Sequence, residues 1–401
     1  MPFNRKFVNV IGSGFAGIEC ALFLASHGVK VHVFDSGKVF EKDVYEEELT
    51  LKKEKSVTLL KKELSFLGSP LIREQERCFL SEKEVLLFGK RLLQESENIK
   101  IIEACVHELN PNEINIIATG SYTDEGMTNL LISKLGGMLC HATMPLYPIF
   151  ENRGNVDKKI DEIQNVGLQY EEYLNLVNSI IEQLNILQPK KEDLVKGSLE
   201  RLALNGRDEI RNFCLRPVIT GCDEEKPYAT IKLKRSDKGY LGLGLATRLP
   251  RASQQQIFDK VLLKHGYELA KEGKILNVCH ICSPFTVNEF HRALNHENLF
   301  FAGSILGISG YVDCIASGLY TALNVLKYIQ EREMIDFPRN TAIGKMVRAI
   351  NNKDRIMGQF VEDYKIFSDE DLNKTNIIES IAKNSFLALE KYREVYNGKY
   401  V

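Results

Sequence analysis

The sequence of 401 residues contains no tryptophan, only 11 prolines and no long apolar segment. No stretch reaches the roughly 18 consecutive apolar residues that a membrane-spanning helix requires. The chain enters an apolar strand almost at once, which leaves no room before it for a secretory leader. These absences predict a cytoplasmic protein that does not enter a membrane.

An excess of charge is also missing, since the formal net charge is −2 at pH 7. A large nucleic-acid interface usually requires a basic face, so this balance leaves RNA binding possible but does not favour it. Local lysine clusters alternate with acidic residues, as is typical of solvated helix faces. They lie at Lys52, Lys53 and Lys55, at Lys61 and Lys62, and at Lys190 and Lys191.

The nine cysteines are mostly scattered singly through apolar segments, which indicates reduced thiols rather than a disulfide framework. Cys279 and Cys282 have the C-x-x-C spacing. No second such pair accompanies them, so we expect no metal site. In an alternating strand these two positions fall on opposite faces, which separates the thiols.

The most informative segment is 8–17, which reads V-N-V-I-G-S-G-F-A-G. A strand leads into glycines at Gly12, Gly14 and Gly17, and a helical pattern follows. The first glycine permits a tight turn, the second lets backbone approach a pyrophosphate, and the third lets the helix pack on the strand. The helix N-terminus supplies N–H groups for the phosphates, and Asp35, ending the next strand, can accept the ribose hydroxyls. The pattern predicts a dinucleotide site.

A second strand–glycine–helix unit late in the chain favours FAD over NAD as the resident, non-covalent cofactor. A buried strand at 298–303 is followed by Gly307 and Gly310 and by a helix expected over 312–329. FAD is longer than one helix N-terminus can hold, so a second helix end can face its flavin part. The predicted FAD-binding residues are Gly12, Gly14, Phe15, Ala16, Gly17, Asp35, Val106, Ala118, Thr119, Gly120, Gly303, Gly310 and Tyr311.

These segments predict an α/β fold with a Rossmann-like FAD-binding domain of the glutathione-reductase type, formed by residues 1–120 and 285–350. Between them the pattern changes to a long helix at 170–187, strands at 226–234 and 239–247, and a helix at 253–263. This change predicts an inserted α+β substrate domain, 121–284. Residues 351–401 are expected to form a C-terminal helical segment that packs on the FAD domain.

Together these motifs resemble the folate- and FAD-dependent RNA uracil-5 methyltransferases of the TrmFO type, over nearly the whole chain. The likeness includes 59–64 (L-L-K-K-E-L) and 244–249 (G-L-A-T-R-L). Its most specific parts lie at 299–319 (L-F-F-A-G…G-I-S-G-Y-V…A-S-G-L) and 337–344 (F-P…T-A-I-G). The resemblance implies FAD, a reduced folate as carbon donor and an RNA uracil as acceptor.

Both cysteines that the family uses are absent, which makes this chain a divergent paralogue. The first family cysteine lies in an E-L-V-C-S-N-S stretch, and the matching residues 48–53 read E-L-T-L-K-K. The second lies ten residues before a glycine, and counting back from Gly206 gives Lys196. Without a uracil nucleophile but with its flavin motifs, the chain is predicted to be a folate oxidoreductase. NAD(P)H would reduce FAD, and the flavin would reduce dihydrofolate or methylenetetrahydrofolate as substrate.

Two alternatives remain open. The first is the family's uracil-5 methyltransferase reaction on tRNA or rRNA, with a relocated nucleophile among Cys214, Cys222, Cys279 and Cys282. The second is a non-enzymatic flavoprotein or RNA-binding remnant.

Arginines of the insertion are the candidates for binding the folate carboxylates, because a guanidinium binds a carboxylate through two parallel hydrogen bonds. Arg248 lies in the best-matched insertion segment, with Arg216 and Arg251 nearby. His280 is a candidate proton donor, and Tyr311 is a second candidate catalytic residue.

Overall fold

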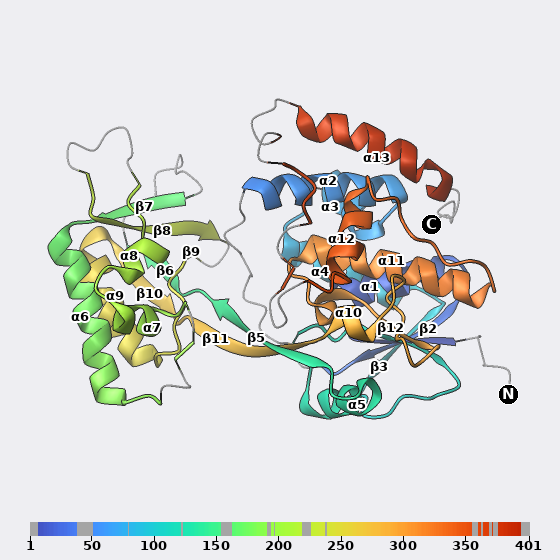
Figure 1. The fold of residues 1–401 in the computed structure, drawn as a ribbon, viewed down its shortest axis with the longest axis horizontal. Coiled ribbons are helices and arrows are strands. Elements are labelled where there is room, and N and C mark those ends of the chain that lie inside the picture. The colour runs from blue at the N-terminus through green and yellow to red at the C-terminus, as the bar shows by residue number, and fades with distance from the viewer. Residues whose placement is uncertain are drawn as a thin grey trace. The chain divides into compact units, whose positions relative to one another are not determined.

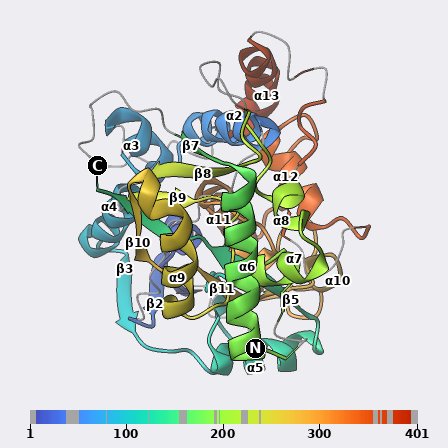
Figure 2. The same ribbon diagram turned by 90° about the vertical axis from the view of Figure 1, so that its left-hand side faces the viewer.

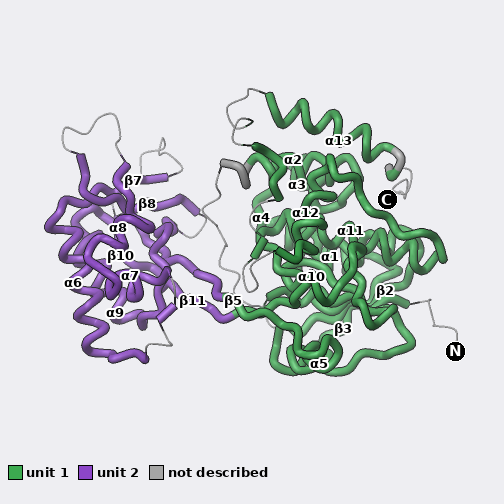
Figure 3. The backbone as a smooth tube through the Cα atoms, in the orientation of Figure 1, with its two compact units in different colours: residues 1–142, 278–401 green, residues 143–277 purple. Residues whose placement is uncertain are grey.

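The structure is a computed structural model that divides into two compact units, residues 1–142 with 278–401 and residues 143–277 (Figure 3). We refer to them as unit 1 and unit 2. The described residues are 7–37, 51–78, 80–121, 123–153, 163–190, 194–195, 197–218, 226–236, 239–354, 360–361, 364–368, 371 and 376–393.

Unit 1 is built on a five-stranded parallel sheet with the strand order β12-β4-β1-β2-β3. The strands are β1 (Phe7–Ile11), β2 (Lys30–Asp35), β3 (Ile99–Glu103), β4 (Ile114–Ile117) and β12 (Leu299–Phe301). β1 and β4 are almost fully buried and, apart from Asn9 and Asn115, consist of apolar residues, because both of their faces are covered. The last strand in sequence therefore completes a sheet begun by the first, as the Rossmann-type prediction requires.

Helices enclose this sheet (Figure 1). α1 (Phe15–Ser26) packs on α11 (Tyr311–Ile329), where a Cβ at Gly318 would lie 2.5 Å from the carbonyl oxygen of Ala16. The absence of that Cβ lets the two helices approach closely. The other helices of unit 1 are α2 (Leu51–Leu67), α3 (Pro70–Cys78), α4 (Glu82–Glu95), α5 (Glu125–Leu135), α10 (Ser283–Thr286), η3 (Gly303–Leu306), α12 (Ala342–Ile350) and α13 (Ile377–Arg393).

Two of the family-like segments meet in unit 1. Glu63, in the 59–64 segment of α2, accepts hydrogen bonds from the backbone N–H of Ala342 at 2.6 Å and of Ile343 at 2.9 Å. These N–H groups begin α12, which the 337–344 segment forms, and Ser385 of α13 donates to the same carboxylate. Glu63 therefore ties three helices together, so these two segments have a structural role.

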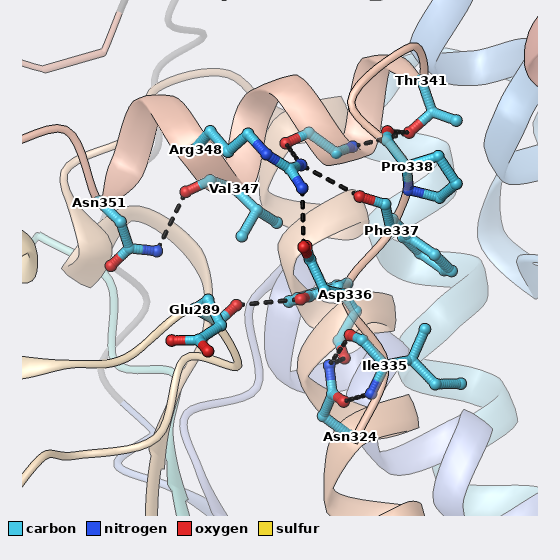
Figure 4. Close-up of polar contacts among 12 residues, drawn as sticks. Glu289, Asn324, Ile335, Asp336, Phe337, Pro338, Thr341, Val347, Arg348 and Asn351 are labelled. Atoms are coloured by element: carbon cyan, nitrogen blue, oxygen red, sulfur yellow. Dashed lines mark hydrogen bonds and ion pairs between the residues drawn. The ribbon is translucent and has the colours of Figure 1, made fainter. Parts of the chain in front are cut away.

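Arg348, near the other end of α12, makes polar contacts that hold the same region (Figure 4). Its guanidinium donates to the carbonyl oxygens of Phe337 at 3.0 Å and Gly344 at 2.7 Å and pairs with Asp336 at 2.7 Å. Thr341 caps α12 by accepting the Gly344 N–H at 2.9 Å. The F-P…T-A-I-G segment is thus a helix start held by side chains on both sides.

Unit 2 has an antiparallel sheet with the order β10-β6-β9-β8-β7. Its strands are β6 (Ile149–Asn152), β7 (Ile163–Leu168), β8 (Ala229–Ser236), β9 (Gly239–Gly242) and β10 (Tyr267–Lys271). Helices α6 (Tyr170–Leu187) and α9 (Arg251–Leu262) pack side by side (Figure 2), and α7 (Leu199–Asn205), α8 (Glu209–Phe213) and η2 (Leu263–His265) complete the unit. Its core is separate from that of unit 1.

The chain crosses between the units in β5 (Leu139–Leu146) and β11 (Lys274–Ile281), which pair as a two-stranded sheet. Unit 2 begins later and ends earlier than the predicted insertion 121–284, because α5 and the first half of β5 belong to unit 1. Among the described residues, no helix combines the length and apolar character needed to cross a membrane.

Candidate functional site

The glycine turn between β1 and α1 has the geometry of a phosphate-binding turn. Gly12 has a φ of 113°, and a Cβ there would lie 2.4 Å from the carbonyl oxygen of Ala118. A Cβ at Gly17 would lie 1.9 Å from the carbonyl oxygen of Gly12. α1 starts after Gly14 without a side-chain cap. Both glycines are sterically required, and the turn presents backbone rather than side chains to a ligand.

Three other predicted segments converge on this turn. Ala118, at the end of β4, donates its N–H to the carbonyl oxygen of Ile11 at 2.8 Å. A Cβ on Gly120 would lie 3.2 Å from the hydroxyl oxygen of Ser304, and one on Gly303 would lie 2.8 Å from the Cβ of Ala16. The carboxyl ends of β1, β4 and β12 therefore meet at one sheet edge, which is where a dinucleotide binds in such sheets.

Asp35 lies at the end of β2, beside the same turn. The hydroxyl of Ser13 donates to it, as does the Gly37 N–H at 3.1 Å, and Lys90 lies 3.5 Å away. Partial burial alone raises the pKa of Asp35, but these two hydrogen bonds and the Lys90 charge outweigh it and hold the pKa below its usual value. Asp35 is therefore an ionised acceptor at neutral pH.

The second helix end is the N-terminus of α11, capped by Gly310 with a φ of 91° and no side-chain cap. Tyr311 packs on Phe15 at 5.5 Å between ring centroids, and Gln75 donates to its hydroxyl at 2.9 Å. The ammonium group of Lys61 lies 5.3 Å from the Tyr311 ring centroid. Tyr311 therefore joins the starts of α1 and α11. Val106, the remaining predicted contact, lies after β3 and packs against the unit 1 core.

Two residues near this turn are given no role by the sequence predictions. Glu19 on α1 is fully buried. Burial raises its pKa to about 8, while Ser69 and the backbone of Leu71 lower it. Cys314, in the first turn of α11, is half-buried and forms no disulfide, and its sulfur lies 3.9 Å from the Cβ that Gly303 lacks. Only the fold shows that Cys314 lies beside the glycine turn.

Arg248 of unit 2 is held in a polar cluster around Glu200. Glu200 is buried and accepts the Thr247 hydroxyl at 2.9 Å and the Arg248 N–H at 2.6 Å. The Arg248 guanidinium donates to Asn277 at 2.5 Å, and its buried Nε makes no hydrogen bond to a described residue. No sequence pattern singles out Glu200, although it lies in the segment that matches the family's second cysteine motif.

The other two predicted arginines are exposed, and their guanidinium groups bind nearby residues of unit 2. Arg216 donates to the carbonyl oxygen of Asn212 at 2.8 Å. Arg251 pairs with Glu272 at 3.1 Å and donates to the carbonyl oxygen of Ala270 at 3.0 Å. Of the three arginines, Arg248 alone combines partial burial with an unpaired guanidinium N–H.

The cysteines of the C-x-x-C separate, and Cys282 forms a disulfide with Cys140. The prediction of reduced thiols is wrong for this pair. Cys279 is buried and free, and burial raises its pKa. His280 is fully buried, with Nδ1 3.0 Å from the carbonyl oxygen of Ile281 and its ring against Phe360.

Cys214 of unit 2 is half-buried and forms no disulfide, at the C-terminus of α8. Its Cβ lies 2.6 Å from the Cβ position of Gly244, which is the beginning of the loop that carries Arg248. Cys222 and Lys196 lie outside the described residues.

Two family models match the chain, "Glucose inhibited division protein A" over residues 149–333 and "Pyridine nucleotide-disulphide oxidoreductase" over residues 8–63. A Thermotoga neapolitana protein named methylenetetrahydrofolate–tRNA-(uracil-5-)-methyltransferase TrmFO is 30% identical over 387 residues, covering 86% of this chain and 88% of that protein. A Fusobacterium nucleatum protein of the same name is 26% identical, covering 98% of this chain and 100% of its own.

A solved structure, that of Aquifex aeolicus GidA, has the same fold. Its TM-score is 0.67 at 15% sequence identity, with 99% of this chain and 74% of that one covered.

Proposed function

Because the chain belongs to the TrmFO family, we propose that it is a folate- and FAD-dependent methyltransferase that acts on carbon 5 of a uracil in tRNA. The observation that carries this proposal is the extent of the likeness to the Thermotoga protein, which runs through both units. A chain that had kept only a flavin-binding half would match only over unit 1.

The relatives overturn the prediction of a folate oxidoreductase. The proteins that match over most of the chain are named as tRNA methyltransferases. The same names correct the expectation that RNA binding is not favoured. That expectation rested on a net charge of −2, which describes the whole chain and not one face of it.

FAD fits the glycine turn of unit 1. Gly12 and Gly17 leave the pyrophosphate path open, Asp35 is an ionised acceptor for ribose hydroxyls, and the uncapped starts of α1 and α11 supply N–H groups. When bound, the flavin supplies the two electrons that reduce the transferred carbon to a methyl group. In this proposal NAD(P)H is the source of these electrons, and methylenetetrahydrofolate provides the carbon.

The reaction requires a nucleophile that adds to the uracil ring and raises the electron density at carbon 5. Both family positions lack a cysteine. Of the other thiols, Cys282 is disulfide-bonded and Cys279 is buried, whereas Cys214 and Cys314 form no disulfide and are half-buried. We propose that one of these two takes over the attack, Cys214 beside the Arg248 loop or Cys314 beside the glycine turn.

The test is 5-methyluridine formation in a tRNA transcript incubated with the protein, FAD, NAD(P)H and methylenetetrahydrofolate, followed by nuclease digestion and mass spectrometry. We expect the wild type to form 5-methyluridine. One of the two variants, Cys214→Ser or Cys314→Ser, should lose methylation activity by at least about 100-fold. Cys78→Ser is the matched control, because Cys78 is an exposed free thiol at the end of α3. Wild-type protein that forms no 5-methyluridine would refute the proposed function.

A further inference from the structure

A hollow on the surface of unit 2 is lined by α7, by α8 and by the segment before α7. It has a volume of about 480 Å³, within the range of small-ligand sites. Both apolar and polar residues line it. The lining residues are Leu194, Gly197, Arg201, Leu202, Asn205, Glu209 and Phe213.

Phe213 is the largest apolar group of this hollow, and 63% of its surface is exposed. The tip of its ring, atom Cζ, lies 3.4 Å from the Cβ position of Gly197, so the ring approaches a residue that has no side chain. An aromatic ring with this much exposed surface is a platform on which a planar group can stack.

The polar side chains of the hollow have the chemistry of a nucleobase partner. The side chains of Arg201, Asn205 and Glu209 make no hydrogen bond or ion pair with another described residue, so their hydrogen-bonding capacity remains available to a ligand. The pairing edge of uracil carries an acceptor, a donor and an acceptor. Arg201 can donate to one carbonyl oxygen, Asn205 can donate to the other, and Glu209 can accept the ring N–H.

Charges around the hollow suit a phosphate backbone. Residues 201–216 contain four arginines against two acidic residues. Arg207 lies between α7 and α8, and Arg216 lies just beyond α8, both exposed. Arg211 stacks over Tyr228 at 4.5 Å. Arginines interleaved with aromatic rings are typical of single-stranded RNA surfaces.

We propose that this hollow is a subsite for an unpaired uracil of the RNA substrate, with the base stacked on Phe213. The inference rests on the proposed function, because it names how unit 2 holds the RNA. The subsite serves recognition, and the base that it holds takes no part in bond making.

The absence of tryptophan from the chain gives a direct test. Phe213→Trp places a single tryptophan at the stacking position, and its emission on excitation at about 295 nm reports stacking by quenching. Leu204→Trp is the matched control, since Leu204 is 52% exposed on α7 but does not line the hollow. We expect oligouridylate to quench the first variant at least about twofold more than the second, and an abasic oligonucleotide to quench both equally.

Binding and methylation assays separate this inference from the proposed function. Phe213→Ala should weaken oligouridylate binding about 10-fold, while Leu204→Ala should leave it unchanged. Equal quenching or equal binding in the paired variants would refute the subsite, even if the wild type methylates tRNA. Selective quenching by a protein that forms no 5-methyluridine would retain the subsite and refute the methyltransferase proposal.

Discussion

The two units differ in how their candidate sites are built. In unit 1 the site is a backbone turn, in which Gly12 and Gly17 are needed because a side chain would clash with backbone 2.4 Å and 1.9 Å away. In unit 2 the candidate site is made of side chains such as Arg248, whose position depends on Glu200 and Asn277, 48 and 29 residues away along the chain. A backbone site leaves a local sequence pattern, and a site of dispersed side chains does not.

The largest effect should come from breaking the turn of unit 1. Gly17→Ala places a Cβ 1.9 Å from a carbonyl oxygen, so we expect it to lower FAD content at least about 10-fold and to destabilise unit 1 by 3 kcal/mol or more, at about the upper limit for overpacking. The ratio of flavin to protein absorbance measures the first effect, and thermal unfolding the second.

Gly28→Ala is the control for this change. Gly28 has a positive φ but open space around its Cβ position, so Gly28→Ala should destabilise unit 1 by only about 1–2 kcal/mol and keep the flavin. Full flavin content in Gly17→Ala would contradict the assignment of the turn.

The stability of unit 1 should depend on pH through the carboxyl group of Glu19. Because the pKa of Glu19 is about 8 when folded and near 4.5 when unfolded, the folded protein retains a proton that the unfolded chain releases between these values. Stability should therefore fall as the pH rises through this window, by about 4 kcal/mol at pH 8. Glu19→Gln should remove this slope in urea unfolding, with Glu97→Gln, on the exposed surface after α4, as a control. The same slope in both variants would exclude Glu19 as its origin.

The smallest effect should come from the dispersed site of unit 2. Arg248→Ala should raise the KM for methylenetetrahydrofolate about 10-fold, the loss expected for one charge-assisted carboxylate contact, and leave FAD content unchanged. Arg251→Ala removes an exposed arginine that is already paired with Glu272 and should change neither quantity. Equal KM values for the two variants would exclude Arg248 from the folate site.

The same contrast explains how much of the fold could be predicted. The helices at 170–187 and 312–329 follow from their apolar periodicity, and the structure places them at Tyr170–Leu187 and Tyr311–Ile329. The segment Gly68-Ser69-Pro70 reads as a helix stop, which is right for α2. Pro70 also begins α3, because proline suits the first turn of a helix, where its missing N–H costs nothing.

Short elements of unit 2 escaped prediction because their partners are distant. β6 has four residues and pairs with β9 and β10, some 90 and 120 residues further along. Cys140 and Cys282 are 142 residues apart, and no local pattern relates them. The position of Phe213 at the end of α8 also brings it close to Gly197, which precedes α7. Periodicity along the chain carries no information about such neighbours.

The position of β12 in the unit 1 sheet has a consequence for synthesis on the ribosome. β4 pairs with β12 along one edge, but roughly 180 residues separate them in the chain. At 5–20 residues per second, the ribosome needs roughly 10–40 s to make that stretch. During this time β4 presents an unpaired apolar edge, which invites association with other chains. The contiguous residues of unit 2 emerge in full within the same interval, so the inserted unit is available to fold before the unit that surrounds it in sequence.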